Sequence, residues 1–138
     1  MIEGQSIGVA NWTSDISGVD GFLGLGPVNL TTGTSSTALE VPTVMDNLYS
    51  QGTISQEVLG VFFSSASESD CNGTLTFGGY DNSVITGPVN YVPLTTTFPA
   101  SEFWGIDQSI SYGNNTILSL TSGIVDTGTT LILIATGG

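Results

Sequence analysis

Basic side chains are absent from this sequence of 138 residues, which has no lysine, arginine or histidine against 12 aspartate and glutamate residues. A nucleic-acid partner is excluded because phosphate binding requires a basic surface, and a net charge of −12 also opposes binding to an anionic membrane surface. Without histidine, neither a Ser/His/Asp nor a Cys/His nucleophilic site can form. One cysteine and scattered acidic residues also predict no metal centre and no cofactor.

Long apolar runs and paired cysteines are lacking as well. No stretch approaches the roughly 20 apolar residues of a membrane-spanning helix. Cys71 has no second cysteine within these 138 residues with which to form a disulfide, and an odd cysteine does not by itself indicate a compartment. The sequence thus predicts no transmembrane segment and leaves the state of Cys71 open.

The acidic composition has a consequence at low pH. Protonation of the carboxylates leaves the chain almost uncharged, so the cation repulsion and histidine charging that commonly assist acid unfolding are missing. A carboxylate with a lowered native pKa still loses its stabilising contribution as the pH falls through that pKa. We therefore predict tolerance of acid, which a melting temperature that drops steeply between neutral pH and about pH 4 would contradict.

Four Asn-X-Thr triplets, the acceptor pattern for N-glycosylation, lie near turn-forming residues. One or two such triplets arise by chance in a chain rich in asparagine, serine and threonine, and we predict that at least one of the four is occupied. The pattern favours the secretory route and a secreted protein, with a vacuolar destination as the alternative. The four acceptor asparagines are Asn11, Asn29, Asn72 and Asn114.

Short β-branched and aromatic runs, separated by glycine, asparagine, serine and proline, predict an all-β fold. One helix interrupts them. Apolar residues at positions 41, 44, 45, 48 and 49 follow helical spacing, Pro42 suits the first turn and Gly52 suits the end. A hairpin turn is expected at residues 113–115. The predicted strands are residues 7–10, 59–64, 74–77, 89–93, 104–112 and 117–120.

The most informative segment runs from Ile124 to Thr130, where a carboxylate follows apolar residues and precedes a glycine. The β-branched pair Ile124 and Val125 favours an extended, buried approach, and Gly128 permits a tight turn. The neighbouring threonine hydroxyls can donate hydrogen bonds to Asp126. We therefore expect Asp126 to be fixed in position by its neighbours.

This segment resembles the second active-site motif of pepsin-like aspartic endopeptidases, in which two apolar residues precede Asp-Thr-Gly-Thr-Ser/Thr. Four further segments resemble the same family in the same order, and together they extend over almost the whole chain. They also indicate the secreted fungal type. These segments are residues 19–27 (VDGFLGLGP), 42–52 (PTVMDNLYSQG), 75–81 (LTFGGYD), and 86–94 (TGPVNYVPL) followed by 103–106 (FWGI).

The resemblance implies a bilobal acid-protease fold that is incomplete here. An enzyme of this family has two lobes, each with one Asp-Thr-Gly, and a flap tyrosine in the first lobe, whereas this sequence contains one Asp-Thr-Gly. Residues 1–94 are expected to form the C-terminal part of the first lobe, and residues 95–138 the beginning of the second. The chain is accordingly expected to be an internal fragment, inactive by itself, with the remainder of its bilobal chain missing.

In the mechanism that the resemblance implies, two carboxylates share a proton and activate a water that attacks a peptide bond of a protein or peptide substrate in acid, as is established for aspartic proteases. Asp126 supplies one of the two carboxylates. Two of the residues implied to bind substrate, Phe22 and Ile124, also fit simple core positions. The full set of substrate-binding residues is Phe22, Ile124, Gly128, Thr129 and Thr130, with Thr127 making a supporting hydrogen bond between the lobes.

Two other functions stay open. A retroviral-type protease also has one Asp-Thr-Gly per chain and pairs across a two-fold axis, but it needs a sizeable ordered segment after the motif, and ten residues follow Gly128. The other alternative is a noncatalytic glycosylated extracellular domain that keeps the fold, because a fold does not guarantee a function. A second Asp-Thr-Gly and a flap tyrosine in the gene upstream of Met1 would favour the protease.

Overall fold

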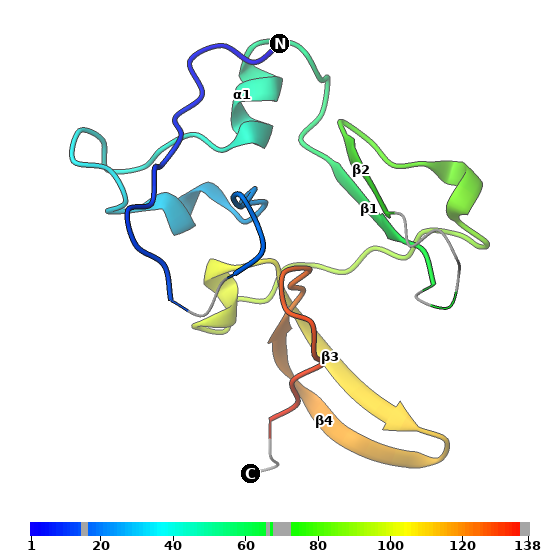
Figure 1. Ribbon diagram of the computed structural model, residues 1–138. Coiled ribbons are helices and arrows are strands. Elements are labelled where there is room, and N and C mark those ends of the chain that lie inside the picture. The colour runs from blue at the N-terminus through cyan, green and yellow to red at the C-terminus, as the bar shows by residue number, and fades with distance from the viewer. Residues whose placement is uncertain (15–16, 66, 68–72, 136–138) are drawn as a thin grey trace. The chain divides into compact units, whose positions relative to one another are not determined.

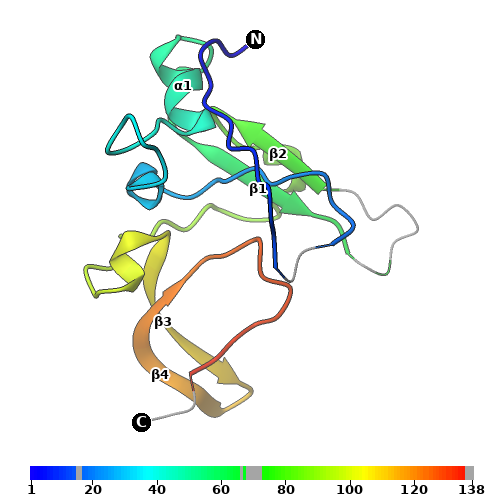
Figure 2. The ribbon, with the colours of Figure 1, turned by 60° about the vertical axis from the view of Figure 1, so that its left-hand side comes forward.

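The computed structural model describes residues 1–14, 17–65, 67 and 73–135, and it divides into two compact units, Met1–Val89 and Asn90–Gly138 (Figure 1, Figure 2). Strands dominate the regular structure and form two separate antiparallel pairs, β1 with β2 and β3 with β4. None of the helices in the described ranges has the length and apolar character needed to cross a membrane. The predicted all-β class is confirmed.

The first unit consists of short helices and one hairpin. Strands β1 and β2 are antiparallel, with Leu59 opposite Phe77 and Phe63 opposite Gly73, and Figure 1 shows them in green. Both strands were predicted, whereas the two 3-10 helices were not. The elements of this unit are η1 (Val28–Thr31), α1 (Val44–Ser50), β1 (Leu59–Phe63), β2 (Gly73–Phe77) and η2 (Asn82–Val84).

Helix α1 begins with a capping box. The Thr43 hydroxyl accepts the Asp46 N–H at 3.3 Å, and the Asp46 carboxylate accepts the Thr43 N–H at 2.7 Å. Two N–H groups at the start of the helix are thereby satisfied. Gly52 follows the helix with φ of 69°, a conformation that glycine adopts at little cost. The helix and its end are as predicted, but Pro42 precedes the cap and does not occupy the first turn.

The second unit contains a longer hairpin. Helix η3 (Ala100–Glu102) leads into β3 (Gly105–Tyr112), which pairs with β4 (Asn115–Ile124). The connection is a two-residue turn, Gly113 and Asn114, within the predicted residues 113–115, whereas Asn115 already belongs to β4. Gly113 takes φ of 57°. This turn lies at the end of the hairpin remote from η3 (Figure 1, Figure 2). Strand β4 is longer than predicted because its pairing with β3 continues to its last residue.

Two predicted strands, residues 7–10 and 89–93, are wrong, because neither segment belongs to a strand. Their apolar side chains lie in solvent, with Val9 92% and Tyr91 78% exposed. A strand needs a partner that satisfies its N–H and C=O groups, and neither segment pairs with a described strand. The sequence pattern therefore indicated strand propensity at positions that have no hydrogen-bonded partner strand among the described residues.

Few side chains are buried in either unit. The buried positions of the described residues are Thr95, Ala100 and Gly105, all in the second unit. The Thr95 N–H donates to the Gly105 carbonyl at 2.9 Å, and a Cβ on Gly105 would collide with the Ala100 carbonyl oxygen. Large side chains such as Phe22 and Phe63, 72% and 66% exposed, lie in solvent instead. Apolar surface of this extent is typical of regions that pack against further protein.

Candidate active site

Asp126 lies in a loop, two residues after strand β4 ends. The backbone N–H of Gly128 donates to its Oδ1 at 2.8 Å, and the Thr129 hydroxyl donates to its Oδ2 at 2.5 Å. On the approach to the loop, the Val125 N–H donates to the Trp104 carbonyl at 2.9 Å. Each carboxylate oxygen thus has a donor from the next three residues, so Asp126 is fixed by its neighbours, as expected.

The two donors also change the acidity of this carboxyl group. They lower the pKa of Asp126 below its ordinary value of 3.8, with the Thr129 hydroxyl contributing most and the Gly128 N–H next, while desolvation acts in the opposite direction. A hydrogen bond to the charged form stabilises it relative to the protonated form. The loop therefore favours an ionised Asp126, the state that a general base requires.

Gly128 is placed where space is limited. A Cβ built on this residue would lie 3.2 Å from Asp126 Oδ1, closer than ordinary van der Waals contact. The same residue brings its N–H to that oxygen. Glycine therefore lets the backbone approach the carboxylate without a side chain pressing on it.

The predicted burial of this segment is wrong for the described residues. Ile124 is 44% and Val125 56% exposed, and Asp126 is exposed. The reason is that β4 pairs with β3 alone, so nothing in the described part of the second unit covers the strand end as a second layer. β-branched residues favour an extended backbone, and whether they are buried depends on what packs over the strand.

The roles expected of the other site residues are not carried by contacts of the described residues. Thr127 makes no hydrogen bond to another described residue, and Thr130 is exposed. Phe22 belongs to the first unit. The structure thus brings Asp126, Gly128 and Thr129 together, and it assigns no contact that would test the roles expected of Thr127, Thr130, Phe22 and Ile124. Of the predicted glycosylation sites, Asn11, Asn29 and Asn114 are described, while Asn72, like Cys71, lies outside the described residues.

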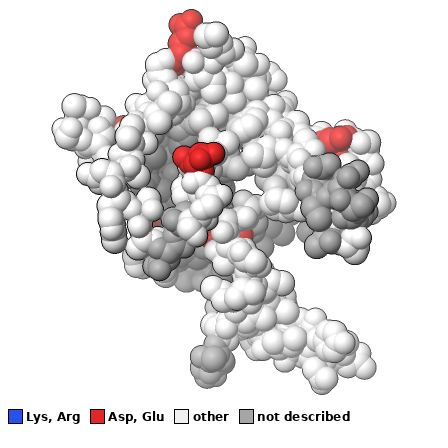
Figure 3. Space-filling view, in the orientation of Figure 1, with Lys and Arg blue, Asp and Glu red and all other residues white. Residues whose placement is uncertain are grey.

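Three other aspartates accept hydrogen bonds, and sequence reasoning missed the partners of all three. Asp46 belongs to the capping box of α1. Asp107 accepts the Thr95 hydroxyl at 2.6 Å, which ties β3 to the buried position before η3. Asp81 caps η2, accepting the Ser83 N–H at 2.8 Å. On the face shown in Figure 3, the acidic side chains of the described residues lie apart and do not gather into one cluster.

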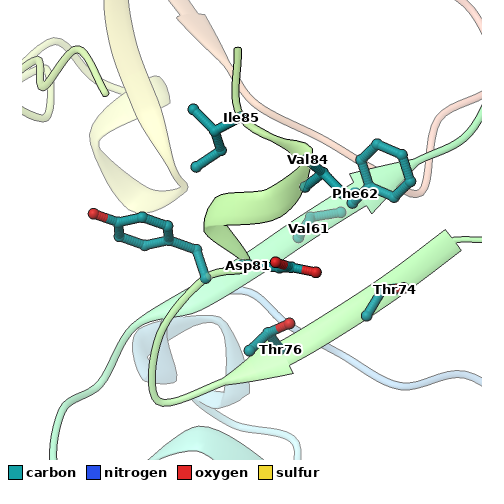
Figure 4. A pocket seen from close by; sticks show the side chains of 9 residues that line it. Val61, Phe62, Thr74, Thr76, Asp81, Val84 and Ile85 are labelled. Atoms are coloured by element: carbon teal, nitrogen blue, oxygen red, sulfur yellow. The ribbon is translucent and has the colours of Figure 1, made fainter. Parts of the chain in front are cut away.

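Asp81 also borders a shallow pocket of the first unit (Figure 4). Its pKa is lowered by Ser83, through the hydroxyl first and the N–H second. Figure 4 shows the Asp81 carboxylate near Thr76 of β2, with Val84 and Ile85 following from η2. The remaining lining residues are Gly60, Val61, Phe62, Thr74 and Tyr80. A pocket and a perturbed carboxylate make Asp81 a competing candidate on physical grounds alone.

An all-β chain with an Asp-Thr-Gly loop at the end of a hairpin defines the aspartic protease class of fold and site. The chain belongs to the family described as "Eukaryotic aspartyl protease", which matches residues 1–137. It is 59% identical over 135 residues to polyporopepsin of Irpex lacteus, and 38% identical over 138 residues to rhizopuspepsin of Rhizopus chinensis. These alignments include 95% and 97% of this chain. Asp126 lies within the matched residues.

The fold comparison agrees with the sequence comparison. The structure is similar to the crystal structure of the aspartic proteinase from Irpex lacteus, with a TM-score of 0.91 and 55% identity over 98% of this chain. That match covers 41% of the Irpex lacteus chain. The chain likewise spans 40% of the length of polyporopepsin and 33% of that of rhizopuspepsin. It therefore has the fold of one part of a larger bilobal protein.

Proposed function

We propose that Asp126 is one of the two catalytic carboxylates of an aspartic endopeptidase that works in acid. The observation that carries the proposal is the loop after β4, in which both oxygens of Asp126 accept hydrogen bonds from the Asp-Thr-Gly-Thr segment. The same loop lies within a chain that matches the aspartyl protease family almost from end to end.

The chemistry requires a second carboxylate. Two acids about 3 Å apart cannot both ionise cheaply, so one is charged and takes a proton from water while the other donates a proton to the substrate carbonyl, the established behaviour of aspartic proteases. The two then titrate as a unit. The hydrogen bonds from Thr129 and Gly128 suit Asp126 to the charged state. These 138 residues contain one Asp-Thr-Gly, so we expect the chain by itself to be inactive.

The substrate is a protein or peptide, and the residues around the loop contact it. Gly128, Thr129 and Thr130 form the substrate side, and Thr127 supports the loop through a hydrogen bond to the opposite lobe. Ile124 and Phe22 border the pockets on either side of the scissile bond. Their exposure, 44% and 72%, supports a role at a surface that a substrate or another segment covers.

The division between lobes is proposed between residues 94 and 95, with the end of the first lobe before it and the beginning of the second after it. The separation of the structure into Met1–Val89 and Asn90–Gly138 supports a boundary in this part of the chain. The partner of both units is the remainder of a bilobal chain. The four Asn-X-Thr triplets support secretion, with a vacuolar destination as the alternative.

A chimera tests the proposal directly. The matched residues of polyporopepsin are replaced by the corresponding residues of this chain, so that the relative supplies the other parts of the fold. We expect digestion of haemoglobin at acidic pH by the chimera, none by the 138-residue chain alone, and a rate roughly 10³-fold lower by the chimera carrying Asp126→Asn. A chimera that has the circular dichroism of polyporopepsin but no activity would instead favour the noncatalytic domain.

A further inference from the structure

The Asn-X-Thr triplet that begins at Asn114 lies at the turn of the β3–β4 hairpin. Asn114 is the second residue of that turn, and Asn114 and Thr116 are both exposed. Neither side chain makes a hydrogen bond to another described residue. The amide that would carry a sugar and the hydroxyl that completes the acceptor pattern are therefore both open to an enzyme.

The triplet that begins at Asn29 has the same chemistry but a different environment. It lies within η1, where Asn29 and Thr31 are half-buried. The Thr31 hydroxyl donates to the Val28 carbonyl at 2.7 Å and accepts the Val41 N–H at 2.7 Å. The middle residue, Leu30, packs back over Gly26, where its Cδ1 lies 2.7 Å from the position of a Cβ. The hydroxyl of this triplet is thus occupied on both its donor and its acceptor side.

Both local structures form quickly compared with chain synthesis. A helical turn forms in about a microsecond or less and a hairpin in about 1–10 microseconds, whereas synthesis adds roughly 5–20 residues per second. Val41 follows Thr31 by ten residues, so it is added to the chain within a few seconds of Thr31. Once the Val41 N–H binds the Thr31 hydroxyl, an enzyme that modifies the chain meets one closed triplet and one open triplet.

We propose that Asn114 is N-glycosylated and that Asn29 is not. In the reaction, a bond forms between Asn114 Nδ2 and C1 of an oligosaccharide carried on a lipid diphosphate. The bond from C1 to the diphosphate oxygen breaks, the lipid diphosphate leaves with the electron pair, and the amide nitrogen loses one proton. The glycan adds a bulky polar group beside Tyr112, which is 80% exposed at the same end of the hairpin, so no packing is displaced. The inference rests on the secretory route of the proposed function and not on catalysis.

The test translates the full chain behind a cleavable signal sequence in the presence of microsomes, which supply the route whatever the natural destination is. Asn11→Gln and Asn72→Gln are made first, so that the two triplets under comparison are the remaining acceptors. We expect one endoglycosidase-sensitive shift in mobility, lost with Asn114→Gln or Thr116→Ala. The shift should persist with Asn29→Gln and with Thr116→Ser, which keeps a hydroxyl. Mass spectrometry of the peptides that contain the two asparagines locates the sugar.

A second variant tests the reason for the difference. Val41→Pro removes the N–H that binds the Thr31 hydroxyl and should raise modification of Asn29. A sugar on Asn29 without this change, or no sugar on Asn114 while Asn11 is modified in the otherwise natural sequence, would overturn the proposal. Efficient modification of Asn114 in microsomes, with the natural protein found inside the cell, would leave the acceptor assignment correct and would contradict only the secretory route.

Discussion

Two aspartates in different units of this chain have nearly the same local geometry. Asp81 and Asp126 each accept the N–H of the residue two positions later, in both cases at 2.8 Å. Each has a pKa below its ordinary value because a nearby hydroxyl and that N–H stabilise the charged form. Local hydrogen bonding therefore does not distinguish a structural carboxylate from a catalytic one.

The two aspartates differ in the residues that come after them and in the structure that they stabilise. The residue two positions after Asp81 is Ser83, the second residue of the short helix η2, whose N–H is capped by Asp81. The corresponding residue after Asp126 is Gly128, and no helix follows it in residues 129–135. The backbone at Gly128 comes close to the carboxylate without a side chain. Physical criteria favour Asp81, which also has a pocket, whereas the family motif favours Asp126. Substitutions at the two sites can separate these interpretations.

The largest expected effect comes from exchanging each acid for its amide in the chimera with polyporopepsin. Asp126→Asn removes a carboxylate that takes part in proton transfer and should lower kcat for haemoglobin digestion by roughly 10³-fold. Asp81→Asn keeps an acceptor for the Ser83 N–H and should leave kcat within about two-fold, because its role is structural. The reverse result would identify Asp81 as the catalytic residue and would sink the assignment of the site.

A second, smaller effect should follow from making the Asp126 loop resemble the Asp81 turn. Gly128→Ser places the residue type of position 83 after Asp126, keeps the N–H donor, and adds a Cβ 3.2 Å from Oδ1. Displacement of the carboxylate should lower kcat by about 10²-fold with little change in KM. Gly87→Ser, at a glycine with open space around it, is the matched control. Equal activities of the two variants would show that glycine is not needed for the approach.

The hairpins and the helix could be predicted because their signals are local. Short β-branched and aromatic runs defined β1, β2 and β3, and helical spacing with Gly52 defined α1. The hydrogen bond from a threonine hydroxyl to Asp126 also followed from the motif, since donor and acceptor are three residues apart.

The features that could not be predicted depend on partners that the pattern does not contain. Residues 7–10 and 89–93 have strand propensity, but a strand exists only where another strand pairs with it. The apolar character of Ile124 and Val125 suggested burial, which needs a second layer over β4. The cap of η2 by Asp81 and the bond from Thr95 to Asp107 were missed, because many polar residues have the same local preference and only the fold selects one pair.

A third experiment compares the acidity of the two carboxyl groups through NMR titration of their side-chain carbons. Thr129→Val removes the main donor to Asp126 and should raise the pKa of Asp126 toward 3.8 without changing that of Asp81. Ser83→Ala should raise the pKa of Asp81 without changing that of Asp126. A lowered native pKa contributes stability that is fully present above the unfolded pKa and is lost as the pH falls through the native pKa. Thr129→Val should therefore be less stable than the natural sequence at neutral pH, with the difference vanishing in strong acid. Thr129→Ser, which keeps a hydroxyl, should show neither change.

The smallest expected effect is on stability, where substitution of Asp81 should be more damaging than substitution of Asp126, the opposite of the order expected for kcat. In the chimera, Asp81→Ala leaves the Ser83 N–H without its acceptor at the start of η2 and should lower the melting temperature by roughly 1 °C. Asp126→Ala should leave the melting temperature unchanged or raise it, because removing one of two close carboxylates relieves their repulsion. Melting curves at neutral pH, where Asp81 and Asp126 are both ionised, measure the difference in melting temperature between the two variants. If Asp126→Ala is the more damaging of the two, the hydrogen bonds of its loop serve chiefly to stabilise the fold, and the separation of a structural from a catalytic aspartate is wrong.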